Sequence, residues 1–142
     1  MHYKRIGLGI LLVCSLVLLL AACGSSADAS SQQVQVTETD FHIASNVTSF
    51  TPGIHYQFMI TNKGKVAHEF MIMPKSEGDM SMMSMNDMDK LALAKMENIA
   101  PGANVTLNYT FSSSASGSHP EFACYYPGHY MSGMKLDVSV GS

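Results

Sequence analysis

The sequence predicts a mostly β domain, a Greek-key antiparallel β-sandwich with one short helix. Two observations carry this prediction. Short stretches of alternating apolar and polar residues recur along the chain from Val34 onward, and turn residues separate them. Several short strands divided by turns at this spacing are typical of a sandwich.

The expected strands follow one another with recognisable turns between them. Thr51-Pro52-Gly53, Asn62-Lys63-Gly64 and Pro101-Gly102 have the composition of turns. The stretch 67–73 is almost wholly apolar, as expected of a strand that is buried on both faces. The strands are expected at 34–36, 40–43, 55–61, 67–73, 104–111, 121–124 and 135–140.

One segment departs from the β pattern and predicts a helix. Asn86-Asp87 can cap a helix that runs from Met88 to about Met96. Leu91, Leu93 and Met96 would be available for packing, and we expect the helix to lie across an open edge or end of the sandwich.

The N-terminus has the order of a secretory signal: basic residues, an apolar run over 6–20, then small residues. Leu20-Ala-Ala-Cys23 resembles the lipobox of bacterial lipoproteins, which implies cleavage before Cys23 and lipidation of its thiol. The sequence therefore predicts a signal peptide at 1–22, a flexible tether at 23–33 and one domain at 34–142. An uncleaved membrane anchor is the alternative, and it also leaves the domain outside the membrane.

Charge and cysteine content narrow the class of protein. Without residues 1–22 the chain keeps six lysines against eleven acidic residues, a net charge of −5, which argues against a nucleic-acid partner. Cys14 would leave with the signal and Cys23 would carry lipid, so Cys124 is the one remaining thiol. A secreted domain with no internal disulfide must rely on its core or on a metal.

The candidate metal ligands lie in two distant stretches. Cys124, His129 and Met134 follow one another at five-residue intervals, and His68 lies far upstream. Two imidazoles, a thiolate and a weak thioether form the donor set of a mononuclear copper electron-transfer site. Zinc gains little from a thioether, and iron–sulfur clusters need more cysteines.

Residues 34–142 resemble the cupredoxins, the type-1 or blue copper proteins. The match is Asn62-x-Gly64-x-x-x-His68 with Cys124-x-x-Pro127-Gly128-His129-x4-Met134, whose spacing is similar to that of auracyanin, rusticyanin and sulfocyanin. The resemblance implies one type-1 copper ion with His68, Cys124 and His129 as equatorial ligands and Met134 as the axial ligand. The chain departs from the family pattern at Glu69, where many members carry Asn or Ser, and at Pro120, where an aromatic residue is common.

A cluster of methionines admits two interpretations. Thioethers select Cu(I), so a Cu(I)-binding arm is one interpretation. The other is that flexible methionines cover an apolar patch near the copper. The cluster consists of Met80, Met82, Met83, Met85 and Met88, whereas Met71 and Met73 are expected to pack.

The sequence favours a one-electron carrier rather than an enzyme. We expect a monomer, tethered outside a bacterial membrane, that passes electrons through His129 to transient redox partners of a respiratory or other electron-transport chain. Pro127, Gly128 and Met131 would form a small docking surface. Copper enzymes need further histidine-rich sites that this sequence does not show. The alternative is a copper-binding protein for resistance or delivery.

Three histidines and three tyrosines are expected to have no role as metal ligands. His42, His55 and His119 have no partner at ligand spacing and are expected to be structural or exposed. Tyr125, Tyr126 and Tyr130 are expected to pack around the site.

Overall fold

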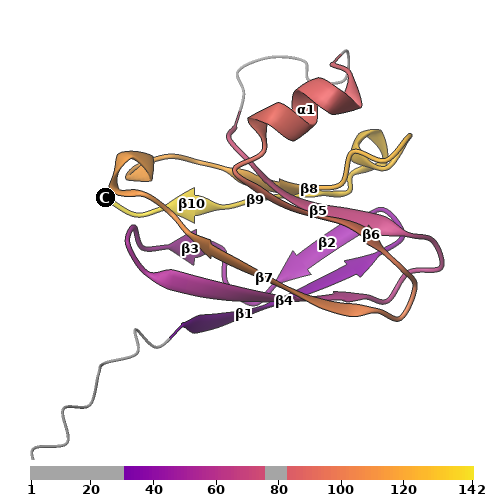
Figure 1. Cartoon of the computed structure of the whole chain (residues 1–142), viewed down its shortest axis with the longest axis horizontal. Coiled ribbons are helices and arrows are strands. Elements are labelled where there is room, and N and C mark those ends of the chain that lie inside the picture. The colour runs from indigo at the N-terminus through magenta and orange to yellow at the C-terminus, as the bar shows by residue number, and fades with distance from the viewer. Residues whose placement is uncertain (1–30, 76–82) are drawn as a thin grey trace, which may run out of the picture.

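The computed structural model describes residues 31–75 and 83–142. Its strands form two four-stranded sheets packed face to face, with a small two-stranded sheet at one end (Figure 1). The strand order is β2-β1-β4-β7 in the first sheet, β6-β5-β8-β9 in the second and β10-β3 in the third. The expectation of a β-sandwich with one short helix is confirmed.

The strands of the first sheet are β1 (Gln32–Thr39), β2 (His42–Ser45), β4 (His55–Asn62) and β7 (Asn104–Thr110). Those of the second are β5 (His68–Met73), β6 (Ala94–Ile99), β8 (Glu121–Ala123) and β9 (Lys135–Asp137). The small sheet consists of β3 (Ser49–Phe50) and β10 (Ser139–Val140).

The core lies between the two large sheets, as the alternation of the sequence predicts. In β4 every second residue is buried, and the residues between them, three of which are polar, face outward. Phenylalanines dominate this core: the ring of Phe50 lies 5.0 Å from that of Phe111 and 5.8 Å from that of Phe122. β5 is buried along its whole length, which shows that both faces of the second sheet are covered.

Two strand pairs are parallel, although the sequence pattern predicted an antiparallel sandwich. β1 pairs with β4 in parallel, and β10 pairs with β3 in parallel. The other neighbours are antiparallel. Alternation reveals which face of a strand is buried but carries no information on strand direction, so the sequence could not distinguish these pairings.

The helix differs from its predicted position. Helix α1 spans Met85–Leu91 with Ser84 as its N-cap, whereas the sequence pattern predicted 88–96. The segment from Ala94 onward is instead strand β6, the edge strand beside β5. Leu91 and Leu93 are exposed, so they do not pack as expected.

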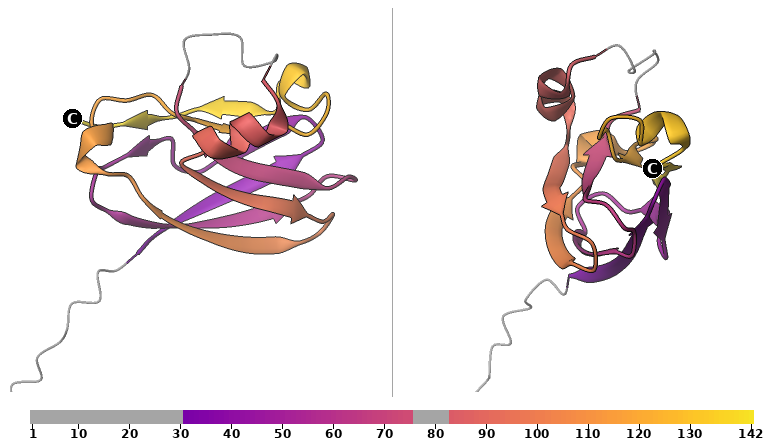
Figure 2. Two further views of the ribbon diagram at one scale, coloured as in Figure 1. Left: turned by 45° about the horizontal axis from the view of Figure 1, so that its top comes forward. Right: turned by 90° about the vertical axis from the view of Figure 1, so that its right-hand side faces the viewer.

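Helix α1 covers the outer face of the second sheet rather than an edge or end of the sandwich (Figures 1 and 2). Its residue Met88 is 3% exposed and packs with Met71 and Met73, whose side chains leave β5 on the side away from the main core. Covering these two methionines explains why β5 is buried on both faces. Met71 and Met73 are therefore packed, as the sequence predicted.

The predicted signal peptide lies outside the described residues. β1 begins at Gln32, before Val34, where the sequence pattern placed the start of the domain. Within residues 31–75 and 83–142, no helix has the length and apolar character needed to span a membrane.

One buried acid interrupts the core. Glu38 is fully buried, and in the part of the chain that the structure describes neither of its carboxylate oxygens has a hydrogen-bond partner. It occupies the inward position of β1 that follows Val34 and Val36. Burial, assisted by the nearby charge of Glu69, raises the pKa of Glu38 to about 8.

This pKa predicts that folding stability depends on pH. Between pH 4.5 and about 8 the unfolded chain ionises at Glu38 while the folded chain keeps the proton, so the free energy of unfolding falls as pH rises. One group contributes a slope of at most about 1.4 kcal/mol per pH unit.

We expect Glu38→Gln to flatten this slope in urea denaturation of the metal-free protein at pH 5, 6, 7 and 8. The exposed Glu97→Gln variant should keep the slope of the original protein. Equal slopes in all three proteins would show that Glu38 does not hold a proton in the folded chain.

Candidate metal centre

The C-terminal part of the site is a loop that hydrogen-bonds to itself. Strand β8 leads directly into Cys124, whose backbone N–H donates to the carbonyl of Met134 at 3.1 Å. The N–H of Met134 in turn donates to the carbonyl of His129 at 3.1 Å. Gly133, with φ 99°, ends the short 3₁₀ turn Tyr130–Ser132 and lets the chain return. The loop therefore places the backbone of the buried Met134 next to that of Cys124.

His68 reaches the site from the first position of β5. The pairing of β5 with β6 contains an irregularity between His68 and Phe70, which changes the alternation of side chains at this end of the strand. His68 is fully buried. Long-range sheet pairing therefore sets the position of this imidazole relative to the loop.

The three side chains meet at one point. The candidate ligand atoms of His68, Cys124 and His129 all lie within 4.8 Å of one another. The Nδ1 atoms of the two histidines are 3.3 Å apart, and Cys124 Sγ lies 3.3 Å from His129 Nδ1. Donors that share one ion at about 2.0 Å (nitrogen) and 2.3 Å (sulfur) lie roughly 3.5 Å apart in a trigonal arrangement. These separations suit one metal ion. Among the described residues, no other group of His, Cys, Asp and Glu side chains meets in this way.

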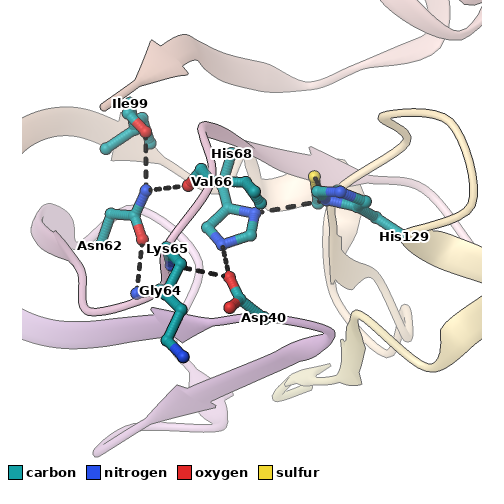
Figure 3. A network of polar contacts seen from close by, with 9 residues as sticks. Asp40, Asn62, Gly64, Lys65, Val66, His68, Ile99 and His129 are labelled. Carbon is teal, nitrogen blue, oxygen red and sulfur yellow. Dashed lines mark hydrogen bonds and ion pairs between the residues drawn. The ribbon is translucent and has the colours of Figure 1, made fainter. Parts of the chain in front are cut away.

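Asp40 orients His68 from the side opposite the cluster (Figure 3). Its Oδ1 lies 3.5 Å from His68 Nε2 and accepts a hydrogen bond from the N–H of Lys65 at 2.9 Å. That hydrogen bond is the main cause that lowers the pKa of Asp40. A carboxylate facing Nε2 favours a proton there, which leaves Nδ1 free to bind a metal.

The turn before His68 is held by Asn62, which is also fully buried. Its Nδ2 donates to the carbonyls of Val66 and Ile99 at 2.9 and 2.8 Å, and its Oδ1 accepts from the N–H of Gly64 at 2.8 Å (Figure 3). One side chain thus fixes the path of the turn and attaches it to β6.

Burial shifts the protonation of two of the ligands. It raises the pKa of the Cys124 thiol to about 11, with smaller contributions from Glu69 and Glu38. It lowers the pKa of His68, as does the neighbouring His129. In the metal-free protein the thiol is therefore protonated and the imidazole of His68 is neutral, so a metal ion must displace the thiol proton.

Glu69 connects the two halves of the site. It is 1% exposed, and its Oε1 accepts a hydrogen bond from the N–H of Tyr125, the residue after Cys124, at 2.7 Å. Burial raises the pKa of Glu69. Although this residue departs from the family pattern, it makes a direct hydrogen bond between β5 and the ligand loop.

Three tyrosines pack around the loop, as the sequence predicted. Tyr125 and Tyr130 stack with their ring centroids 4.5 Å apart, and both hydroxyls donate to Glu121. The hydroxyl of Tyr126 donates to Asn98 Oδ1 at 3.0 Å and accepts from the N–H of the same residue. These contacts attach the loop to β8 and β6.

Phe41 is a neighbour of the site that the sequence did not reveal. It adopts φ 68°, an uncommon value for a bulky residue, and its ring lies edge-on to that of His129 with centroids 5.5 Å apart. It remains 47% exposed. Phe41 therefore adds an apolar side chain to the surface beside His129.

The other sequence candidates lie apart from the cluster. His42, His55 and His119 are exposed, and His55 contacts Thr110 instead. His119 lines a separate cavity of about 620 Å³ together with Pro74 and Tyr109, and this cavity includes none of the metal-site residues.

The methionine cluster is only partly described. Met80 and Met82 lie outside the described residues, as does the side chain of Met85. Met83 is 37% exposed, and Met88 is buried on the face of α1 that packs against Met71 and Met73. Copper binding by this cluster stays a prediction.

Sequence reasoning missed Asp40, Phe41 and the role of Glu69. Nothing in the local sequence around Asp40 links it to a histidine almost thirty positions away, because the contact depends on how the β1–β2 turn meets the turn before β5. Asn62 and Gly64 were recognised as a turn and as part of the motif that ends at His68. That motif was the signal in the sequence that the turn before β5 belongs to the site.

Solved structures support the fold assignment. Auracyanin from Roseiflexus castenholzii, reduced with dithionite, aligns with a TM-score of 0.62 at 19% identity, over 79% of this chain and 98% of its own. Auracyanin B aligns with a TM-score of 0.62 at 19% identity, over 78% and 89%. An azurin from Methylomonas sp. strain J aligns with a TM-score of 0.56 at 19% identity, over 80% and 100%.

The protein therefore has the cupredoxin fold. Its sequence matches no protein-family model and no curated protein. The donor set of His68, Cys124 and His129, with the buried Met134 next to Cys124 in the loop, is typical of a type-1 copper site.

Substitution of Gly64 tests whether the packing around His68 determines copper binding. A Cβ at this position would lie 2.6 Å from His68 Nε2 and would also overlap the carboxylate of Asp40. We expect Gly64→Ala to displace His68 and lower copper affinity by tenfold or more, measured by competition with a chromophoric chelator. Gly141→Ala is the control, because its Cβ would meet only Phe50 O at 3.6 Å. Equal affinities would show that the packing around His68 does not determine copper binding.

Proposed function

We propose that this protein is an extracytoplasmic one-electron carrier that uses one type-1 copper ion. The observation that carries the proposal is the convergence of His68, Cys124 and His129 at one buried end of a β-sandwich. Copper supplies one-electron chemistry by alternating between Cu(I) and Cu(II). The chain holds the donors in place from both sides: Asp40 lies behind His68, and Glu69 of β5 accepts a hydrogen bond from the ligand loop.

His129 is the proposed route for electrons. Unlike His68 and Cys124 it is only half-buried, and apolar side chains are exposed nearby: Phe41, from the turn between β1 and β2, contacts the His129 ring, and Met131 follows two residues after His129. A small apolar surface of this kind suits brief contact with a redox partner protein. The partners are proposed to be redox proteins of a respiratory or other electron-transport chain, and the protein is proposed to act as a monomer and not as an enzyme.

The N-terminal segments support a membrane location. We propose that 1–22 is a signal peptide, that Cys23 carries lipid, and that 23–33 tethers the domain to the outer side of a bacterial membrane. The lipobox-like Leu20-Ala-Ala-Cys23 and the basic start of the chain support this assignment.

The thiolate–copper bond provides the direct test of the main proposal. Cu(II) added to the protein should produce an intense visible charge-transfer band, and Cys124→Ser should abolish it. Met134→Leu should keep the band and raise the reduction potential by about 60 mV or more, because the apolar side chain donates nothing to Cu(II). Visible and paramagnetic resonance spectra with counted copper, followed by redox titration, measure these effects.

Met59→Leu, which changes an exposed methionine on β4, should alter neither spectrum nor potential. A colourless protein after addition of Cu(II), or a band that survives Cys124→Ser, would contradict the assignment.

The lipid anchor is tested by cell fractionation. Cys23→Ser should move the protein from the membrane fraction to the soluble extracytoplasmic fraction, because no thiol remains at the lipobox position. Cys14→Ser lies inside the proposed signal peptide and should leave the protein in the membrane fraction. Retention of the Cys23→Ser variant in the membrane fraction would contradict the lipobox assignment.

A second function, copper resistance or delivery, is favoured by one observation. Met83, Met88 and Met131 line the same cavity, beside the ligand loop. Such a protein should bind more than one equivalent of Cu(I), whereas a simple carrier should bind one. Because Met88 packs α1 against Met71 and Met73, point substitutions of exposed methionines are a cleaner test than deletion of the whole segment.

A further inference from the structure

A small cavity lies against the ligand loop, outside the cluster of His68, Cys124 and His129. Its volume is about 160 Å³, and residues 125–128 form part of its wall. These residues join Cys124 to His129, so a single stretch of backbone borders both the cavity and the copper site.

Three methionines from separate parts of the chain line this cavity: Met83 before α1, Met88 within α1 and Met131 after His129. Packing explains Met88, which is 3% exposed, but not the other two. Met131 is 74% exposed and Met83 is 37% exposed. A methionine that merely filled a gap in the core would be buried.

The lining has the chemistry of a site for a soft cation. Thioether sulfurs bind Cu(I) in preference to harder ions, and long unbranched side chains can move to meet an ion. Tyr125, Tyr126 and Tyr130 complete the wall, but Tyr125 and Tyr130 stack on each other and Lys135 Nζ already lies 4.4 Å from the Tyr130 ring, so the thioethers are the donors for the ion.

We propose that Met83, Met88 and Met131 form a second, weaker site for Cu(I), from which the ion passes to the type-1 site. The transfer is a ligand exchange without electron movement: thioether–copper bonds break, bonds to His68, Cys124 and His129 form, and the Cys124 thiol releases its proton to solvent. This proposal rests on the proposed copper function for the destination of the ion, whereas the second site itself can be tested separately.

The binding test uses the full chain with reduced copper in the type-1 site and methionine methyl groups labelled with ¹³C. Ag(I), a redox-inert and diamagnetic ion of the same softness, is the probe. We expect one equivalent to bind and to shift the methyl resonances of Met83, Met88 and Met131. The double variant Met83→Leu/Met131→Leu should lower the affinity at least tenfold, while Met59→Leu/Met96→Leu should retain it.

Three results would overturn the second site: shifts confined to Met80, Met82 and Met85, equal affinity in the two double variants, or release of type-1 copper as Ag(I) binds. Zn(II) should produce no methyl shifts, and equal binding of Zn(II) would contradict a site that depends on thioethers.

The transfer test measures how fast the metal-free protein takes up Cu(I) from a chelator. Samples are oxidised at intervals, and the visible band reports the filled type-1 site. We expect loading to be at least fivefold slower in Met83→Leu/Met131→Leu, with the final intensity unchanged. Unchanged loading rates would overturn the transfer role, whereas absence of the band in every protein would instead contradict the main proposed function.

Discussion

At one end of the sandwich His129 Nδ1 lies 3.3 Å from both His68 Nδ1 and Cys124 Sγ, and much of the surrounding structure serves to hold these donors there. Electron-rich donors at this distance repel one another unless a cation or a proton lies between them. The protein opposes this repulsion with contacts from both sheets. Asp40 lies behind His68, Asn62 fixes the preceding turn, and Glu69 accepts a hydrogen bond from the ligand loop.

Carboxyl groups in the interior near the site have an energetic cost. Glu38 and Glu69 are both buried, and desolvation raises the pKa of each. The same carboxyl groups contribute to the raised pKa of Cys124. A buried carboxyl group loses its hydration, and keeping the proton, as Glu38 does up to about pH 8, avoids the larger cost of burying a charge. Local costs of this kind are common at functional sites.

The second sheet links the site to the rest of the molecule through both of its faces. Its inner face completes the phenylalanine-rich core, and its outer face carries Met71 and Met73, which α1 covers. Because α1 packs there, Met88 comes to lie beside the tyrosines of the ligand loop. The same packing that buries the outer face therefore forms the methionine-lined cavity next to the copper site.

The sequence by itself determined the fold class, most strands and the donor set, because alternation, turn residues and the Cys124–His129–Met134 spacing are local properties. It misplaced α1 and missed β6, since the apolar residues of 91–96 suit either structure until a neighbouring strand is known. Only the tertiary structure decided the parallel pairing of β1 with β4, the carboxylate behind His68 and the burial of Glu38. Each depends on contacts between residues far apart in the chain, and local residue patterns carry no information on such contacts.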